Sequence, residues 1–420
     1  MKFQGGRRMS NNSDVVEATP RRIPRLRFPE FLDKPEWGTK RIGEFAKVTT
    51  GNKDTQNKVD GGEYPFFVRS QNVERINSFS YDGEAILTSG DGVGVGKNFH
   101  YINGKFDFHQ RVYSIYDFSK DVSGRFFFRY FTEHFNKRVM QLSAKNSVDS
   151  VRMSMITEMP VQLPNWDEQN KVANCLSSLD DLINAESSKL ESLRIHKTGL
   201  MQQLFPAEGG STPLLRFTEL VNTGDWNEVQ LSQIASAVKL KNKNQEKSVV
   251  LSLSSEHGLV SQTDYFLKKI AGENTEKYIK IQENDFVYND RVTKSSKYGT
   301  IKRLSKYTAG IVSPIYKCFR FNEDQNPIFW QWYFESKSHE TQLNSIINEG
   351  ARAGRFNISI DNFLSTIVFQ PLSNEQQKIA DCLSSLDDLV TAQEAYISTL
   401  NQQKKGLMQQ LFPSSDEAAE

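Results

Sequence analysis

The sequence has few of the residues from which metal centres, disulfide frameworks and membrane spans are built. Its 420 residues include three cysteines, Cys175, Cys318 and Cys382, and six histidines. No two cysteines form a CxxC pair and no histidine lies at metal-ligand spacing, so we expect neither structural zinc nor disulfides. No apolar run approaches the roughly 18–20 residues that cross a bilayer, and none follows the basic N-terminus. These absences predict an unexported, cytoplasmic protein.

The overall charge is nearly neutral, but the charged residues are unevenly distributed along the chain. The chain has 52 Lys and Arg against 51 Asp and Glu, and its length predicts more than one domain. Residues 1–33, 34–165 and 209–373 each carry a net charge of +3, whereas residues 166–208 carry −3 and residues 374–420 carry −5. Mildly basic blocks therefore alternate with acidic ones.

An internal repeat dominates the sequence. EQNKVANCLSSLDDLINA (Glu168–Ala185) returns 207 residues later as EQQKIADCLSSLDDLVTA (Glu375–Ala392), and KTGLMQQLFP (Lys197–Pro206) returns as KKGLMQQLFP (Lys404–Pro413). Across residues 168–206 we count 23 identities in 39 positions. Such agreement does not arise by chance.

A second, weaker repeat precedes each large block. PRLRFPEF (Pro24–Phe31) matches PLLRFTEL (Pro213–Leu220), and Trp37 then corresponds to Trp226. The chain therefore carries two diverged copies of one domain, each followed by one copy of the strongly repeated segment.

The repeated segments have the period of paired helices. Apolar residues alternate four and three positions apart, which is the a/d seam of a coiled coil. Pro164 and Pro371 precede the segments, and Pro206 and Pro413 end them. In each copy the seam is interrupted by one polar residue and one lysine. The apolar seam residues that we expect to pair are Leu176, Leu179, Ile183, Leu190, Leu193, Leu200, Leu383, Leu386, Val390, Ile397, Leu400 and Leu407.

The blocks between these helices contain short β-branched or aromatic runs bounded by Gly, Asn and Asp, which is typical of strands. We predict strands at 64–68, 84–87, 112–116, 249–253 and 311–319, and one helix per block, at 125–142 and 328–347.

The expected fold class is α+β, with two tandem mixed α/β domains separated by two long helices that pair as an antiparallel, pseudo-two-fold symmetric coiled coil. The predicted segments are an N-terminal extension (1–23), a first domain (24–165), a central helical region (166–206), a linker with the second domain (207–373), a C-terminal helical region (374–413) and a tail (414–420).

Three segments resemble catalytic motifs but lack the spacing, the residues or the surroundings that those motifs require. GDGVGVGK (Gly90–Lys97) lacks the spacing of a P-loop and of a dinucleotide fingerprint, so it is either a glycine-rich hairpin or a loop whose N–H groups approach a phosphate. The nuclease-like triplet Glu335-Ser336-Lys337 fits a solvated helix face. Asn326–Phe329 partly matches the base-holding signature of amino-methyltransferases, but it lacks the second proline and a cofactor motif. We predict no catalytic and no metal-binding residue in this chain.

Two related domains on two paired helices suit a ligand with two recognition elements at fixed spacing, such as half-sites on duplex DNA. Polar and basic clusters interrupt the strand pattern, and their side chains can bind phosphates or base edges. Each cluster taken alone also fits a solvated loop, and His109 fits a structural role as well as a DNA contact. The candidate DNA-binding residues are Arg69, Gln71, Asn72, Lys97, Asn98, Gln110, Arg111, Arg152, Lys239, Lys241, Lys243, Asn289, Arg291, Lys294, Lys297, Arg352 and Arg355.

The order of these features resembles the specificity subunit of a type I restriction–modification enzyme. The resemblance covers roughly residues 24–413. It rests on the order of the Trp37 domain, the EQNKVANCLSSLDDLINA helix, GLMQQLFP, the RF-x-E-L entry, the Trp226 domain, the EQQKIADCLSSLDDLV helix and a second GLMQQLFP. It implies two target-recognition domains, each reading one half of a bipartite DNA sequence. It also implies that the helical regions set the spacing and dock other subunits.

The resemblance also implies a division of labour. Two modification subunits, using S-adenosylmethionine, and two ATP-dependent restriction subunits, with Mg²⁺, would carry the chemistry, and this chain would hold no cofactor. Because the two blocks differ internally, we expect two different half-sites and an asymmetric target. Residues 1–23 lie outside the resemblance and fit a partner-binding arm or an unstructured leader. Two alternatives stay open: a coiled-coil scaffold for protein or glycan ligands, and a self-contained DNA nuclease or methyltransferase.

Overall fold

The computed structural model describes residues 23–142, 150–207, 210–244, 248–263, 274–292, 296–346, 356 and 358–413. The chain divides into two compact units: unit 1 is Met1–Glu186 with Tyr396–Glu420, and unit 2 is Ser187–Ala395. Each unit thus contains one globular domain and part of both long helices. In the described part of the chain, no helix is long and apolar enough to cross a membrane.

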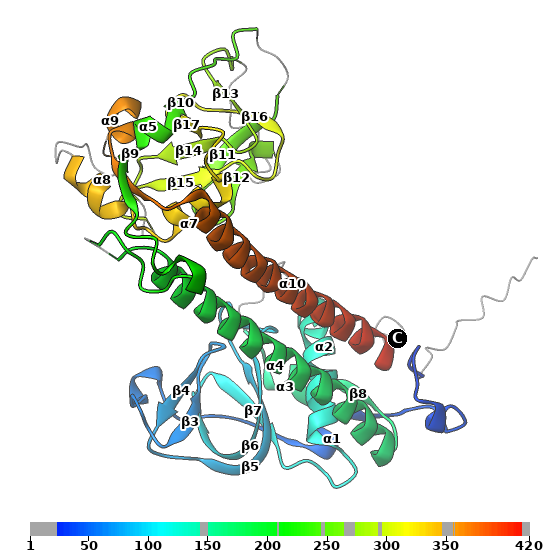
Figure 1. Cartoon of the computed structure of the whole chain (residues 1–420). Helices are drawn as coiled ribbons and strands as arrows, with labels where there is room; N and C mark the ends of the chain where they lie inside the picture. The colour runs from blue at the N-terminus through cyan, green and yellow to red at the C-terminus, as the bar shows by residue number, and fades with distance from the viewer. Residues whose placement is uncertain are drawn as a thin grey trace, which may run out of the picture. The chain divides into compact units, whose positions relative to one another are not determined.

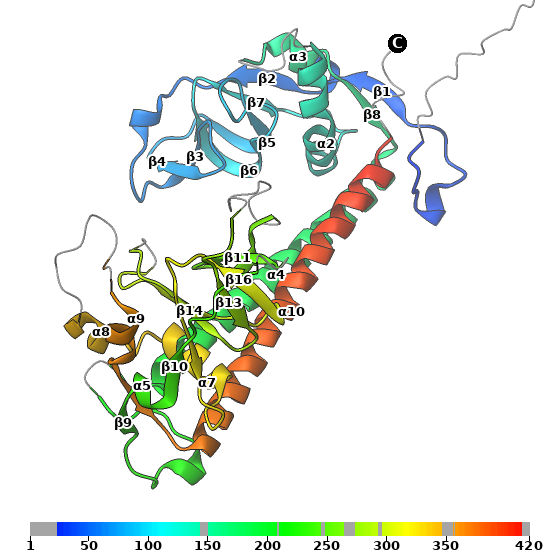
Figure 2. The ribbon, with the colours of Figure 1, turned by 90° about the horizontal axis from the view of Figure 1, so that it is seen from above.

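Unit 1 is built on a six-stranded sheet in the order β2-β7-β5-β6-β3-β4. All neighbours are antiparallel except β3 and β6. The 19-residue helix α2 packs against β5 and β6 (Figure 2). A two-stranded ribbon of β1 and β8 stands apart from the sheet. The elements are η1 (Pro29–Phe31), β1 (Gly38–Arg41), α1 (Ile42–Phe45), β2 (Lys47–Thr50), η2 (Thr55–Asn57), β3 (Tyr64–Phe67), β4 (Val73–Ile76), β5 (Tyr81–Ser89), β6 (Phe99–Phe108), β7 (Val112–Tyr116), α2 (Gly124–Leu142), α3 (Met153–Thr157) and β8 (Pro160–Leu163).

Unit 2 repeats the β1-α1-β2 start as β9-α5-β10, and β9 pairs with β18 as β1 does with β8. Its strands form two four-stranded sheets, β10-β17-β14-β15 and β12-β11-β16-β13. The elements are η3 (Thr218–Leu220), β9 (Asn227–Gln230), α5 (Leu231–Ile234), β10 (Ala235–Ala237), β11 (Val250–Ser254), β12 (Gly258–Ser261), β13 (Ile279–Gln282), β14 (Phe286–Asn289), β15 (Thr300–Arg303), β16 (Ala309–Val312), β17 (Lys317–Phe321), α7 (Pro327–Glu335), α8 (Glu340–Ile346), α9 (Ile360–Leu364) and β18 (Ile367–Gln370).

The two sheets of unit 2 correspond to the single sheet of unit 1. The long hairpin strands β5 and β6 are each replaced by two short strands, β13 with β14 and β15 with β16. The break between β13 and β14 falls at Asn284, which has a φ of 69°, a conformation that asparagine tolerates. Arg303 donates to Asn284 Oδ1 at 2.6 Å, so the bend is held by a side chain. One extended sheet has thus become two.

Two expected elements are wrong in detail. The helix predicted at 328–347 is interrupted between α7 and α8, where Lys337 has a φ of 68° that ends the first helix. The strand predicted at 311–319 is β16 and β17, separated by a turn at Pro314. Local apolar periodicity continues through both breaks, so it did not reveal them.

The repeated segments form two 39-residue helices, α4 (Trp166–Leu204) and α10 (Ser373–Leu411) (Figure 1). All twelve apolar seam residues predicted to pair are buried or half-buried. Two leucines off the seam, Leu182 and Leu389, are 39% and 58% exposed. The seam is therefore the covered face of each helix.

Within each unit the two helix segments run antiparallel. In unit 1 the Lys404 ammonium pairs with Asp180. In unit 2 the Lys197 ammonium pairs with Asp387 at 2.5 Å. The lysines that interrupt the seam therefore find equivalent aspartates on the opposite helix, which fixes the register.

The weaker repeat also has a structural reason. Arg27 makes a two-pronged pair with Glu168, with both contacts at 2.8 Å, and Arg216 pairs in the same way with Glu375. These four side chains are at most 7% exposed. Each arginine therefore ties the segment before its domain to the first turn of the helix that follows it.

The phenylalanines of the GLMQQLFP segments enter the domain cores. Phe412 packs edge-on against Trp37 in unit 1, and Phe205 packs edge-on against Trp226 in unit 2. Both phenylalanines are at most 2% exposed. The end of each long helix is thus part of a hydrophobic core.

Candidate nucleic-acid interface

Three separate polar segments of unit 1 meet at one end of its sheet. They are the loop after β3, the β5–β6 loop and the turn before β7. Gln71 Nε2 donates to Lys97 O at 3.0 Å and to Asn98 Oδ1 at 3.1 Å. Asn98 Nδ2 donates to Arg69 O at 2.9 Å. We call Arg69, Gln71, Asp91, Asn98 and Arg111 the unit 1 polar cluster.

Asp91 connects two arginines of this cluster. Its Oδ1 accepts from Arg69 Nη1 at 2.8 Å, and its Oδ2 lies 3.6 Å from Arg111 Nη1. The Asp91 side chain is 20% exposed, whereas Arg69 and Arg111 are 47% and 65% exposed. Two guanidinium groups therefore face solvent above a largely covered carboxylate.

Two histidines support the loops beneath these arginines. His109 is 3% exposed, and its Nδ1 accepts from the Arg111 N–H at 2.9 Å. His100 Nε2 lies 3.0 Å from Ser70 O. Burial lowers the pKa of both rings, which favours the neutral form. Of the two roles that fit His109, the structure favours the structural one.

The other candidates of unit 1 lie around the cluster. Lys97 and Asn72 are exposed beside Gln71, and Gln110 Nε2 donates to Asp54 Oδ2 at 3.0 Å. Arg152 is the exposed residue before α3, close to the point where Ser150 bridges Asp91. Every unit 1 candidate is exposed except Asn98, which is half-buried.

The glycine-rich segment is the loop of the β5–β6 hairpin. Gly92 has a φ of 77° and Gly96 a φ of 66°, where glycine is favoured. A Cβ at Gly94 would lie 2.1 Å from the Asn98 side chain. The tip residue Val93 is 97% exposed. The glycines thus let the loop pack against Asn98 while it displays its tip.

In unit 2 two of the candidates, both lysines, line one hollow. Lys239 and Lys241 line a hollow of about 570 Å³ together with Lys277 and Lys317. Lys239 Nζ lies 3.8 Å from Asp361 Oδ1, and both side chains are exposed. The Lys317 ammonium is paired with Asp290, so Lys239, Lys241 and Lys277 are the lysines of this hollow that suit a phosphate. We call these four residues the lysine hollow.

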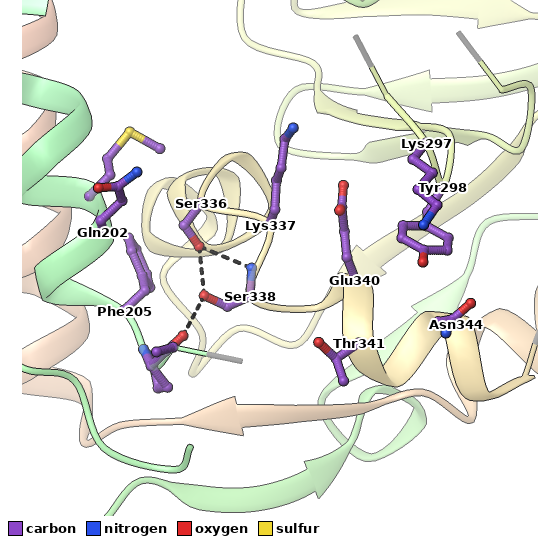
Figure 3. A pocket seen from close by; sticks show the side chains of 13 residues that line it. Gln202, Phe205, Lys297, Tyr298, Ser336, Lys337, Ser338, Glu340, Thr341 and Asn344 are labelled. Atoms are coloured by element: carbon purple, nitrogen blue, oxygen red, sulfur yellow. Dashed lines mark hydrogen bonds between the residues drawn. The ribbon is translucent and has the colours of Figure 1, made fainter. Parts of the chain in front are cut away.

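Lys297 lies elsewhere in unit 2. It lies over the Tyr298 ring at 5.2 Å and lines a separate pocket of about 490 Å³ with Lys337 and Glu340 (Figure 3). Figure 3 shows Ser336 and Ser338 in contact on the other side of this pocket, where their hydroxyls are 2.9 Å apart. The structure therefore separates Lys297 from the lysine hollow.

The remaining unit 2 candidates are dispersed or not described. Lys243 and Arg291 are exposed, and Asn289 is the half-buried last residue of β14. Lys294, Arg352 and Arg355 lie outside the described residues, as do residues 1–22 of the predicted extension.

Sequence reasoning missed three residues of these surfaces. Asp91, Lys277 and Lys317 were not predicted, because single charged residues in a glycine-rich loop, a turn and a strand carry no local signal. Among the described residues, no group of three or more His, Cys, Asp or Glu side chains could hold a metal ion. The described candidate residues of both units carry guanidinium, ammonium and amide groups, which bind phosphates and base edges.

Residues 34–194 match the family model described as the type I restriction modification DNA specificity domain. Over these residues the chain is similar to that family, as the sequence resemblance predicted. The match covers β1 to β8 of unit 1 and most of α4. The second copy of this arrangement in the chain, in unit 2, lies outside the match.

Curated relatives are similar over part of their length. The type I restriction enzyme EcoDI specificity subunit of Escherichia coli is 28% identical over 231 residues, which are 49% of this chain and 50% of that protein. A putative MjaX specificity subunit from Methanocaldococcus jannaschii is 30% identical over 83 residues, or 19% and 20% of the two chains. The matches thus span about half and about a fifth of these relatives.

Solved structures are similar over nearly the whole chain. The type I restriction-modification S subunit from M. genitalium aligns with a TM-score of 0.56 and 14% identity, covering 93% of this chain and 99% of that one. A chain from a structure on complex assembly and conformational transition of the type I R-M system aligns with a TM-score of 0.53 and 11% identity, covering 90% and 98%. The predicted fold class is confirmed.

Proposed function

We propose that this chain is the sequence-specific DNA-recognition subunit of a type I restriction–modification complex. Each globular domain reads one half of a bipartite, asymmetric target, and the long helices set the spacer and dock the modification subunits. The observation that carries this proposal is that unit 1 matches a specificity domain and that unit 2 repeats its arrangement of elements. In both units, the seam lysine pairs with the equivalent aspartate of the opposite helix.

The exposed side chains support two different readers. Unit 1 presents arginines with amides, which suit guanine and adenine edges in the major groove. Unit 2 presents the lysine hollow, whose point charges suit phosphates. Because the two surfaces differ in residue type, they favour different half-sites and a target that is not palindromic.

The proposal assigns chemistry to partner proteins. Two modification subunits would bind S-adenosylmethionine and methylate adenine, and two restriction subunits would use ATP and Mg²⁺. This chain would then be a non-catalytic subunit without a cofactor. Such a complex would act in the cytoplasm, where its DNA lies.

The decisive experiment is methylome sequencing of a host that expresses this chain with its modification partner. We expect one methylated motif with two unlike halves separated by a fixed, unread spacer. Methylation without a motif, or a motif with two identical halves, would contradict the proposal. A matched control pairs the same modification partner with a chain in which unit 1 candidates Arg69 and Arg111 are both alanine.

A further inference from the structure

Asp91 occupies an unusual place for a carboxylate. It lies in the β5–β6 loop beneath Arg69 and Arg111, and each of its two oxygens faces one of these arginines, at 2.8 and 3.6 Å. If unit 1 binds DNA through this cluster, the carboxylate repels the phosphates that the arginines attract. Its presence therefore needs a compensating role.

Loop folding does not supply that role. The main chain holds the loop: the Gly90 N–H donates to Arg111 O at 2.8 Å, and the Val151 N–H donates to Gly90 O at 2.7 Å. These bonds use backbone groups of neighbouring residues and not the Asp91 side chain. What the carboxylate does is hold two guanidinium groups in place.

Unit 2 has a carboxylate at the equivalent junction. Asp290 directly follows β14 as the β5–β6 loop follows β5, and its Oδ2 accepts from Lys317, the first residue of β17. The strand β17 pairs with β14 as β7 pairs with β5. The two loops have diverged in sequence, yet both place a carboxylate against a cation at the start of the adjacent strand.

We propose that Asp91 is a positioning residue, which orients Arg69 and Arg111 to read a guanine in one half-site. This inference rests on the proposed function and names the base that unit 1 recognises. A guanidinium held in place loses less conformational entropy on binding, and arginine binds the O6 and N7 of guanine through two hydrogen bonds. Asp91 thereby favours base specificity over simple attraction to phosphate.

The test compares Asp91→Asn with the wild-type full chain, assembled with its modification subunits. The probes are a random-sequence duplex library and a non-specific duplex. We expect Asp91→Asn to lose preference for guanine in one half-site while the other half-site stays unchanged. Affinity for the non-specific duplex should rise because a negative charge has been removed, so the specific to non-specific ratio falls about tenfold or more.

Asp117→Asn is the matched control. Asp117 lies just after β7, at the end opposite Arg111, and pairs with Lys47 at 2.7 Å. Like Asp91→Asn, this variant removes one carboxylate from an ion pair. The backbone should accept the change, because asparagine tolerates the φ of 57° at this position. We expect it to select the wild-type motif in full.

A positioning residue acts through its arginines. Adding Asp91→Asn to an Arg69→Ala/Arg111→Ala variant should therefore cause no further loss of base preference. An unchanged guanine preference in Asp91→Asn, or equal loss at both half-sites with a lowered melting temperature, would overturn the inference. Failure of the wild-type complex to select any motif would instead overturn the proposed function.

Discussion

The buried pair of Arg27 and Glu168 makes a quantitative prediction. Glu168 accepts two hydrogen bonds from Arg27 at 2.8 Å and one from Trp37 Nε1 at 3.2 Å, and the two charged side chains are 3% and 1% exposed. Arg27→Met removes the countercharge and leaves a carboxylate in the core. Breaking a buried pair in this way costs about 3–5 kcal/mol.

For a unit of this size, each kcal/mol lowers the melting temperature by about 2–4 °C, so we expect a fall of about 6–20 °C. Differential scanning calorimetry of the full chain measures it. The exposed pair of Lys40 and Asp121 supplies the control, because its side chains are 43% and 60% exposed and Lys40→Met should cost about 1 kcal/mol or less.

The reasoning also predicts a rescue. In the Arg27→Met background, Glu168→Gln removes the uncompensated charge and keeps an acceptor for Trp37, so it should recover much of the lost stability. A shift for Arg27→Met no larger than that of Lys40→Met would refute the argument. So would a double variant that is less stable than the single one.

Three further perturbations test other parts of the molecule. Leu386→Asp should separate the paired helices and abolish selection of a bipartite motif, whereas Leu389→Asp, at a 58% exposed position on the same helix, should leave it intact; methylome sequencing compares them. Arg111→Ala and Arg291→Ala should each relax one half-site, a different one in each case, and loss at both would contradict independent reading. Burial lowers the pKa of His339 to about 3, whereas an unfolded histidine titrates near 6.5, so the unfolded state binds more protons below that pH. His339 should therefore contribute a loss of stability of about 1.4 kcal/mol per pH unit as pH falls below about 6.5. Denaturant unfolding at pH 7 and 5 should show that His339→Phe flattens this slope.

The sequence by itself determined the long helices. The heptad pattern and the flanking prolines place them within a few residues of α4 and α10, and the repeat establishes that there are two. A coiled-coil seam is a local, periodic signal, because the same face must be apolar at every turn. The seam lysines were visible as interruptions, but their aspartate partners were not.

Only the tertiary structure decided how the loops meet. Arg69, Asp91 and Arg111 are separated by some twenty residues each, and strand pairing within one sheet brings them together. Nothing local marks Asp91 as a partner of either arginine. The same holds for Lys277 and Lys317 in the lysine hollow, which adjoin Lys239 through strands distant in sequence.

The break in the sheet of unit 2 and the buried arginines show which features depend on the sequence alone and which depend on the folded chain. Repetition of Arg27 as Arg216 and of Glu168 as Glu375 marked these residues in the sequence, yet their pairing across 141 residues is a property of the folded chain. The apolar periodicity of one helix or strand can be read directly from the order of its residues. A contact between elements depends on which strands pair and how they bend, and many sequence positions share the same residue types.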